Sequence, residues 1–460
     1  MIAVGVDVGS TSIKALAIDA ETREIVASYS EALECFIPNL PSGRHELDSL
    51  LLRKQVHRVI ASLAARVRDS GRAIERIAFT GQMHGGLFID RDFQPLSNCI
   101  TWQDKRADEP SPSGKPLISE IRESLPRAEW DLTGGDIFTG FLGATAHWFA
   151  RRNEMPEHGT LIGIYDWLAS ELCGEAVTDP SSASAWGMYD IVHHTWSSKI
   201  LHALGLTEEM LPRVVPTGEV AGNVRSKFSE LLLNSNVLVV SGMGDTQASY
   251  LGSGCRREEL LLNVGTGSQC MWRHEGFVRL QGSDTRILTG NTYLITISTL
   301  SGGLAYALLA EFIARTLQEF TGQSIAKEGI YRRMNELATD KLAASEKLNA
   351  NEAPIFSPLF NGSRQQGEQL RASIVHLTRQ NFTIDELIRA AIVGMIDELA
   401  VPFLALPAAE RNLHGILASG NGIRRNPAMQ QIAEQRFGLP LRIGADVEEA
   451  ALGAAMAAAK

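Results

Sequence analysis

The stretch MIAVGVDVGSTSIKALAIDA, residues 1–20, places two apolar runs on either side of a turn of small residues. Residues 2–8 have the length and β-branched content of a strand, and residues 15–18 resume that character. The pattern predicts a β-hairpin whose tip, residues 9–12, presents backbone N–H groups that can bind an anion. An ordinary tight turn is the alternative. Asp7 lies inside the first apolar run, where an acidic residue is unusual and therefore indicates a specific role.

The same design recurs near the middle of the chain. EELLLNVGTGSQCMWRH, residues 258–274, is again an apolar strand, a Gly-small-Gly-Ser turn and a resumed strand. Strand-like runs alternate with helical patterns elsewhere, which favours an α/β fold. We therefore expect two lobes of one construction, over residues 1–250 and 251–460. The first should open with an antiparallel meander over 2–8, 15–19 and 24–30, and the second should end in an Ala-rich helix from about residue 448.

The bulk composition excludes several classes of protein. The 460 residues carry a net charge of −10, which disfavours a general nucleic-acid binder. An acidic chain can still bind a polyphosphate if backbone amides and a metal ion neutralise it. No apolar stretch is long enough to span a membrane, and the N-terminus has no signal-peptide pattern. The five scattered cysteines form no C-x-x-C pair, so a reducing cytoplasm is the expected location.

Four glycine-rich or acidic turns each follow an apolar strand, at residues 9–12, 242–245, 265–268 and 419–422. Each turn alone is a weak signal. Their order across two lobes resembles the nucleotide cleft of the actin-like ATPase superfamily. A G-x-x-x-x-G-K-[ST] sequence is absent, and no G-x-G-x-x-G follows the first strand, so P-loop and Rossmann sites are disfavoured.

A second cluster follows the strand-like segment near residue 80. FTGQMHGGLFID (79–90) and ITWQDKRADE (100–109) gather side chains that suit a polyhydroxylated ligand. Gln82 and His84 can both donate and accept hydrogen bonds. Trp102 offers an apolar face to sugar C–H groups, and Asp104 and Arg106 add polar contacts. A histidine satisfied in the core is the alternative for His84.

The chain resembles the FGGY family of carbohydrate kinases along essentially its whole length. The resemblance rests on VGVDVGSTSIKA, TGQMHG, WQDKR, GMGDTQASYLG, LNVGTGS, SGNGIRRNPAMQQIAEQRFGLPL and EEAALGAAMAA, in the family's order, although the letters FGGY do not occur. It implies two actin-like (ribonuclease H-like) lobes with a nucleotide cleft between them. The implied reaction is transfer of a phosphoryl group from ATP, with Mg²⁺, to a sugar hydroxyl.

The resemblance also assigns roles to residues. Asp245 falls on the family's general base, with a plain helix N-cap as its alternative. Asp7 would organise Mg²⁺ through water, with Asp245 beside the metal. A solvated strand lysine is the alternative for Lys14. The implied sugar contacts are Gln82, Met83, His84, Trp102, Asp104, Arg106 and Gln247. The implied ATP contacts are Gly9, Ser10, Thr11, Ser12, Lys14, Gly265, Thr266, Gly267, Ser268, Gly302, Gly420, Asn421 and Gly422.

The sugar is expected to be a ketose, because xylulokinases and sedoheptulokinases share Gln-Met-His-Gly. The segments around Thr145, Trp186-Gly187 and Gln247 resemble the sedoheptulokinase group more closely, whereas Lys105 replaces a common glycine. We therefore expect a sedoheptulokinase, with a kinase for xylulose or another ketose or polyol as the alternative. A non-catalytic nucleotide sensor is the alternative from another class. The expected partners are the sugar and ATP, and a homodimer is compatible with the sequence.

Overall fold

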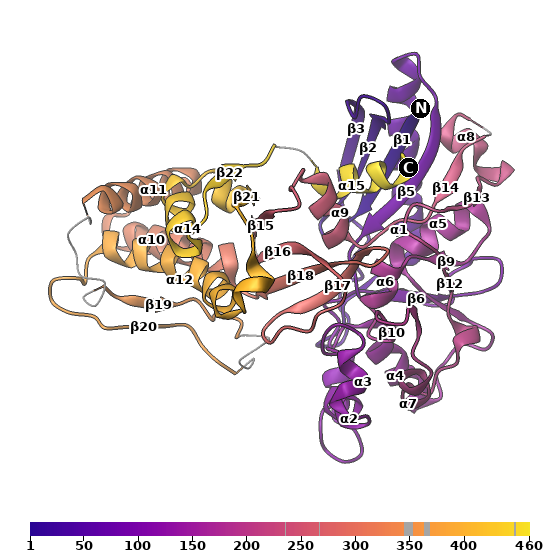
Figure 1. Ribbon diagram of the computed structural model, residues 1–460, viewed down its shortest axis with the longest axis horizontal. Helices are drawn as coiled ribbons and strands as arrows, with labels where there is room; N and C mark the ends of the chain where they lie inside the picture. Colours follow the sequence, from indigo (N-terminus) through magenta and orange to yellow (C-terminus); the bar gives the residue numbers. More distant parts are fainter. Residues whose placement is uncertain (235, 266, 345–352, 363–368, 446–447) are drawn as a thin grey trace.

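The computed structural model describes residues 1–460 except for residues 235, 266, 345–352, 363–368 and 446–447. Two six-stranded sheets form the centres of two lobes (Figure 1). The first has the order β13-β14-β5-β1-β2-β3. Its strands are β1 (Ile2–Val8), β2 (Ser12–Asp19), β3 (Ile25–Ala32), β5 (Ile74–Gly81), β13 (Val220–Asn223) and β14 (Leu238–Val240).

The second sheet repeats this construction. Its order is β17-β18-β16-β15-β21-β22. Its strands are β15 (Glu259–Val264), β16 (Ser268–Glu275), β17 (Asp284–Thr289), β18 (Thr292–Thr299), β21 (Gly415–Ser419) and β22 (Leu441–Ile443). In each sheet the opening strand is antiparallel to the next strand of the chain and parallel to a later one: β1 pairs with β2 and β5, and β15 pairs with β16 and β21. The predicted two-lobed α/β fold is confirmed.

The central strand β1 explains the apolar opening of the sequence. A strand with neighbours on both edges and helices on its faces is buried on both sides, so it is apolar at nearly every position. Six of its residues are buried and only Asp7 is partly exposed. The adjacent helix α1 (Ser49–Asp69) covers this sheet with a stripe of Leu52, Val56, Val59, Ile60, Leu63 and Val67. It begins at Asp48, whose side chain accepts from the Leu51 N–H at 2.9 Å.

The second lobe is covered by long helices. The buried faces of α10 (Gly302–Thr321), α11 (Lys327–Ala344), α12 (Ile384–Ala405) and α14 (Pro427–Phe437) form one core with the second sheet. Among the described residues, no helix is both long and apolar enough to cross a bilayer.

A subdomain built mainly from the chain between β5 and β13, with β4 (Glu46–Leu47) added from before β5, has its own core. It contains the sheet β4-β7-β6-β8, of which β6 (Gly86–Ile89) and β8 (Thr160–Gly163) are the longer strands, with β4 and β7 (Cys99–Ile100). Its helices are α2 (Leu117–Glu123), α3 (Arg127–Asp131), α4 (Leu142–Arg152), α6 (Pro180–Ser184) and α7 (Ser198–Leu204). Ile287 and Tyr293, from the β17–β18 hairpin of the second lobe, belong to this core. Helix α5 (Ile164–Cys173) packs instead in the core of the first sheet.

The last helix returns to the first lobe. Helix α15 (Glu449–Ala458) follows β22 of the second sheet, yet it packs against β1 and against α9 (Asp245–Gly252), as Figure 1 shows. Glycines allow the close approach: a Cβ on Gly453 would lie 1.9 Å from the Ala248 carbonyl oxygen, and one on Gly5 would lie 2.0 Å from that of Ala451. The end of the chain, which the boundary near residue 250 assigns to the second lobe, therefore packs on the first.

The remaining elements are short. They are β9 (Val177–Thr178), β10 (Tyr189–Asp190), β11 (Thr195–Trp196), β12 (Arg213–Val214), β19 (Ile355–Ser357), β20 (Ser373–Val375), α8 (Ser229–Leu232) and α13 (Asn421–Arg424).

Candidate active site

Asp245 begins helix α9 at the point where the chain leaves strand β14. It is partly buried, and burial raises the pKa of its carboxyl to about 6, against a lowering effect of hydrogen bonds from Thr246. A carboxylate with a pKa near neutrality is suited to accept a proton from an alcohol at physiological pH. The position also matches a helix N-terminus, so the electrostatics and not the position alone identify Asp245 as a candidate base.

Asp7 lies close enough to Asp245 for their charges to interact. Burial, followed by the charges of Asp245 and Glu448, raises the pKa of Asp7 to about 7, while Lys14 lowers it. In the β1–β2 hairpin, Asp7 stands opposite Lys14. The hairpin tip is closed by a 3.0 Å hydrogen bond from the Gly9 N–H to the Ser12 carbonyl. The opening segment therefore brings an acid and a glycine tip to the same end of the central strand.

Lys14 has a charged partner that the sequence did not indicate. Its Nζ lies 2.5 Å from a carboxylate oxygen of Glu448, the residue directly before α15. The ammonium is therefore not simply solvated, as one alternative for Lys14 supposed, and its contact with ATP stays a prediction. Lys14 thus ties α15 to the first hairpin.

The Gln-Met-His-Gly turn packs directly against the turn that carries Asp245. The Gln82 N–H donates to the Val8 carbonyl at 3.0 Å, and the Met83 side chain lies against Gly244, where a Cβ would be 2.5 Å from its terminal methyl. His84 donates from Nδ1 to the Ala185 carbonyl at 2.7 Å and stacks on Phe141 with a ring separation of 4.2 Å. The predicted sugar cluster is therefore adjacent to Asp245.

Two buried amide atoms near Gly244 have no hydrogen-bond partner among the described residues, namely Gln82 Nε2 and Gln247 Oε1. The Gln247 side chain is fully buried, and its Nε2 donates to the carbonyl of Ile287 on β17 at 3.0 Å, so it bridges the two lobes. A buried amide without a partner is unfavourable, and a hydroxyl brought to it by a ligand would remove that cost. These two residues suit a polyol ligand.

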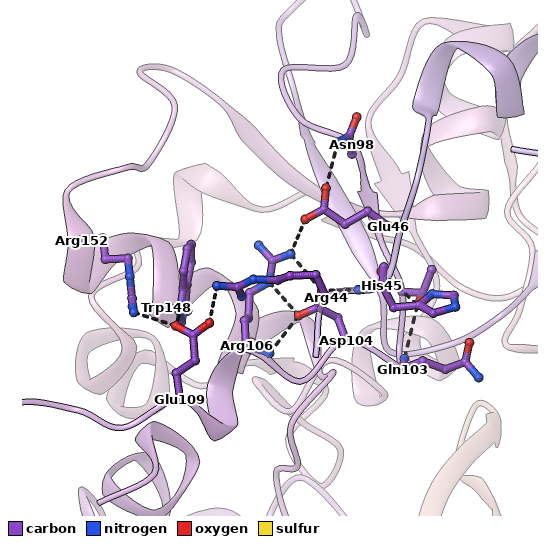
Figure 2. Close-up of polar contacts among 11 residues, drawn as sticks. Arg44, His45, Glu46, Asn98, Gln103, Asp104, Arg106, Glu109, Trp148 and Arg152 are labelled. Carbon is purple, nitrogen blue, oxygen red and sulfur yellow. Dashed lines mark hydrogen bonds and ion pairs between the residues drawn. The ribbon is translucent and has the colours of Figure 1, made fainter. Parts of the chain in front are cut away.

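Asp104 and Arg106, two of the predicted sugar contacts, are paired with each other inside the protein. Asp104 is fully buried and receives the Arg106 guanidinium at 2.8 and 3.0 Å and the His45 N–H at 2.8 Å. Figure 2 shows Arg106 between Asp104 and Glu46, with a 2.6 Å hydrogen bond to the latter. Because this pairing engages both charges internally, the two residues fix the loop. Their contact with a sugar stays a prediction.

Trp102, in the same loop, has a side chain that reaches solvent and is 38% exposed. Its carbonyl oxygen lies against Gly140, where a Cβ would be only 2.0 Å away and φ is +83°. Gly140 precedes Phe141, the ring that stacks on His84. The loop that Asp104 and Arg106 hold therefore places the Trp102 backbone beside Gly140, next to the Phe141 ring that stacks on His84.

The second hairpin joins β15 to β16 in the other lobe. The Gly265 N–H donates to the Gly267 carbonyl, and the Gly303 N–H at the start of α10 donates to the Gly265 carbonyl, both at 3.0 Å. Gly302 contacts Ser268 so closely that a Cβ would lie 1.9 Å from the Ser268 hydroxyl oxygen, which is buried and has no hydrogen-bond partner within the described part of the chain. The predicted contact Thr266 lies outside the described residues.

A cavity of about 1170 Å³ opens beside this hairpin in the second lobe. Gly265, Asn421 and Gly422, three of the predicted ATP contacts, line it together with residues of α10 and α11. Gly420, with φ +86°, packs against the Val264 carbonyl and turns the chain toward the cavity. Sequence reasoning missed Tyr306, Tyr331, Arg332 and Asn335, because the helical periodicity of these segments does not distinguish a cavity wall from a core face.

The acidic pair fits a Mg²⁺ ion that also binds phosphates. Mg²⁺ in such sites takes one or two carboxylates and fills its other positions with water and phosphate oxygens. Asp7 and Asp245 supply two carboxylates whose pKa values are raised by burial, and a divalent cation would relieve their repulsion. No group of three or more metal-ligating side chains occurs in the part of the chain that the structure describes.

Two hairpins on repeated lobes, a carboxylate at the head of α9 and a cavity beside the second hairpin define a two-lobed phosphotransferase of the actin-like class. The chain belongs to the FGGY family of carbohydrate kinases, whose N-terminal domain matches residues 2–252 and whose C-terminal domain matches residues 288–460.

The chain is similar to kinases that are named for different substrates. Human sedoheptulokinase is 26% identical to this chain, in an alignment that covers 99% of this chain and 96% of the human protein. The crystal structure of a xylulose kinase from Rhodospirillum rubrum has a TM-score of 0.88 and 21% identity, covering 100% of this chain and 89% of that one. The structure of Plasmodium falciparum glycerol kinase with ADP has a TM-score of 0.82 and 21% identity, covering 99% and 88%.

Asp7→Asn is expected to stabilise the metal-free protein at pH 8 by about 1–3 kcal/mol. The folded state raises the pKa of Asp7 from 3.8 to about 7, so ionisation of this group opposes folding above pH 7. The gain should shrink as pH falls from 7 and vanish only below the unfolded-state pKa of 3.8, where Asp7 is neutral in both states. Urea unfolding in EDTA at several pH values measures this difference.

Asp19→Asn is the matched control for this prediction. Asp19 lies on the same sheet, but backbone N–H donors lower its pKa, so its replacement should give no gain at pH 8. Equal stability of Asp7→Asn and wild type across the pH range would contradict the proposed free-energy cost of ionising Asp7 in the folded protein.

Proposed function

We propose that this carbohydrate kinase transfers the γ-phosphoryl group of ATP to the terminal primary hydroxyl of a ketose, and that the ketose is sedoheptulose, giving sedoheptulose 7-phosphate. The observation that carries the proposal is the placement of Asp245, with its pKa of about 6, between the first hairpin and the Gln82–His84 turn. A base poised between a phosphate-binding tip and a polyol-binding turn suits this reaction.

In the proposed reaction the sugar hydroxyl oxygen forms a bond to the γ-phosphorus while the bond to the bridging oxygen of ADP breaks. The hydroxyl proton passes to Asp245. Gln82 and His84 would orient the sugar, and the N–H groups of both glycine tips would hold the phosphates in line. Bound Mg²⁺ would neutralise charge on the phosphates, with Asp7 and Asp245 holding it. The nucleoside would occupy the cavity lined by Asn421 and Gly422.

The choice of sedoheptulose rests on similarity in sequence. Human sedoheptulokinase covers nearly the whole chain, and the segments around Thr145, Trp186 and Gln247 resemble that group. Thr145 and Trp186 are both buried, so they would act on the sugar through the shape of the subdomain core. Xylulose is the second candidate, because xylulose kinases also match the chain along 99% of its length.

A ketose panel tests the proposal. Purified protein with ATP and Mg²⁺ is offered sedoheptulose, xylulose, fructose and glycerol, and ADP release is measured together with sugar phosphate. The proposal expects the highest kcat/KM with sedoheptulose. A sharp preference for xylulose would overturn the assignment of sedoheptulose as the substrate. ATP hydrolysis at a rate that does not depend on any added sugar would favour a nucleotide sensor. A lobe boundary near residue 250, which falls within α9, and a cytoplasmic location are parts of the same proposal.

Ala307→Phe is expected to raise the KM for ATP by at least about tenfold, equivalent to about 1.4 kcal/mol of binding free energy. Ala307 lies on α10 and lines the 1170 Å³ cavity, so a phenyl ring would occupy space proposed for the nucleoside. The KM for the sugar should stay nearly unchanged. Gln318→Phe on the exposed side of the same helix is the control and should alter neither constant. An unchanged KM for ATP in Ala307→Phe would place the nucleoside elsewhere.

A further inference from the structure

A buried polar network lies beneath the turn that carries Asp245. Its centre is Asp179, the N-cap of the short helix α6, which is fully buried. The Asp179 carboxylate accepts from the Ser181 hydroxyl at 2.9 Å, from the Ser182 N–H at 2.8 Å and hydroxyl at 2.7 Å, and from the Thr217 hydroxyl at 2.6 Å. So many donors on two oxygens fit the ionised carboxylate, which only accepts.

The network reaches Asp245 through one hydrogen bond. A serine hydroxyl has a single proton, and that of Ser181 is directed to Asp179, so its remaining lone pairs can only accept. The donor that they receive is the backbone N–H of Gly244, at 2.9 Å. Gly244 is the residue before Asp245, and its carbonyl accepts from the Ala248 N–H in the first turn of α9.

We propose that Ser181, oriented by Asp179, is a positioning residue for Asp245. The Gly244 N–H is held by Ser181, and the Gly244 carbonyl is held by α9. The two peptide groups on either side of Gly244 therefore have little freedom to rotate, and the second of them leads into Asp245. Gly244 cannot be held by a side chain of its own, since a Cβ there would meet Met83 at 2.5 Å and the Gln247 amide oxygen at 2.7 Å. The inference rests on the proposed kinase function.

The same short segment also holds the sugar-binding side. The Ala185 carbonyl, directly after α6, accepts from His84, and the Ser184 carbonyl accepts from Arg286 of β17 at 2.9 Å. Helix α6 therefore links the candidate base, the histidine turn and the second lobe. A small displacement of a general base from the hydroxyl that it deprotonates has a large effect on the rate.

The test compares two buried serines on this helix. Ser184 is as buried as Ser181, but its hydroxyl donates to the Ser181 carbonyl within the helix. Ser181→Ala should lower kcat for the preferred sugar by about tenfold or more, because the Gly244 N–H loses its acceptor. The KM for ATP should change by less than about twofold. Ser184→Ala should keep kcat within about twofold of wild type.

A double-mutant cycle distinguishes positioning from a general loss of structure. In the Asp245→Ala background, Ser181→Ala should reduce the residual rate by less than about twofold, because no carboxylate is left to position. Equal losses in the two serine variants, or the full Ser181 effect without Asp245, would overturn the inference. If Ser181→Ala does not fold, Ser181→Cys keeps the side-chain volume with a weaker acceptor and takes its place. A wild-type protein that phosphorylates no sugar would refute the proposed function itself.

Discussion

Asp245→Ala is expected to lower the sugar-dependent kcat by at least about 100-fold while ATP still binds. The structure gives two reasons. Asp245 is the candidate base whose pKa, raised by burial to about 6, suits proton transfer near neutral pH, and it lies against the turn that carries Gln82 and Met83. The cavity proposed for the nucleoside, in the second lobe, is lined by none of these residues, so the affinity for ATP should persist.

The measurement combines a coupled assay for ADP with calorimetric titration of ATP. Asp245→Asn should lose a similar factor, because the amide keeps the shape but cannot accept the proton. Asp92→Ala, in an exposed turn, controls for loss of negative charge and should behave as wild type. If Asp245→Ala kept near-normal turnover, another group would have to take the proton and the proposed mechanism would be wrong.

The sequence predicted the parts of this site that depend on local pattern. An apolar strand that ends in a small-residue turn predicts a hairpin wherever it occurs, so β1–β2 and β15–β16 were found with the correct limits to within a few residues. The contact between the Gln82–His84 turn and the Asp245 turn could not follow from pattern, because it depends on the parallel pairing of β1, β5 and β14. The family resemblance supplied that neighbourhood.

Long-range pairing is what sequence reasoning could not foresee. Asp104 and Arg106 form a polar pair in a loop, and nothing local indicates that Glu46 lies beside Arg106. Lys14 was likewise interpreted without Glu448, its ion-pair partner 434 residues later in the chain. In both cases a charged side chain next to a site turned out to hold the fold together. Ser181 is the opposite case, since an unremarkable serine contacts the base turn.

Gly453→Ala is expected to destabilise the protein by about 3 kcal/mol, although alanine is the better helix former by about 1 kcal/mol. Gly453 lies in α15, where a Cβ would be 1.9 Å from the Ala248 carbonyl oxygen and 2.6 Å from its carbon. Both atoms belong to the backbone of α9, so neither can rotate away. The two helices would have to separate, and α9 carries Asp245 at its first turn. Urea unfolding and kcat for the preferred sugar should both be affected.

Gly329→Ala is the matched control, because it adds the same methyl to a helix where only a side chain has to move. Gly329 lies in the first turn of α11, and the nearest neighbour of its new Cβ would be the Cγ2 methyl of Ile325 at 3.3 Å, which has to give by only a few tenths of an ångström. Its stability should be equal to or slightly above that of wild type. If Gly453→Ala were as stable as Gly329→Ala, α15 would not be packed as described, and the link from the end of the second lobe to the helix of the candidate base would be lost.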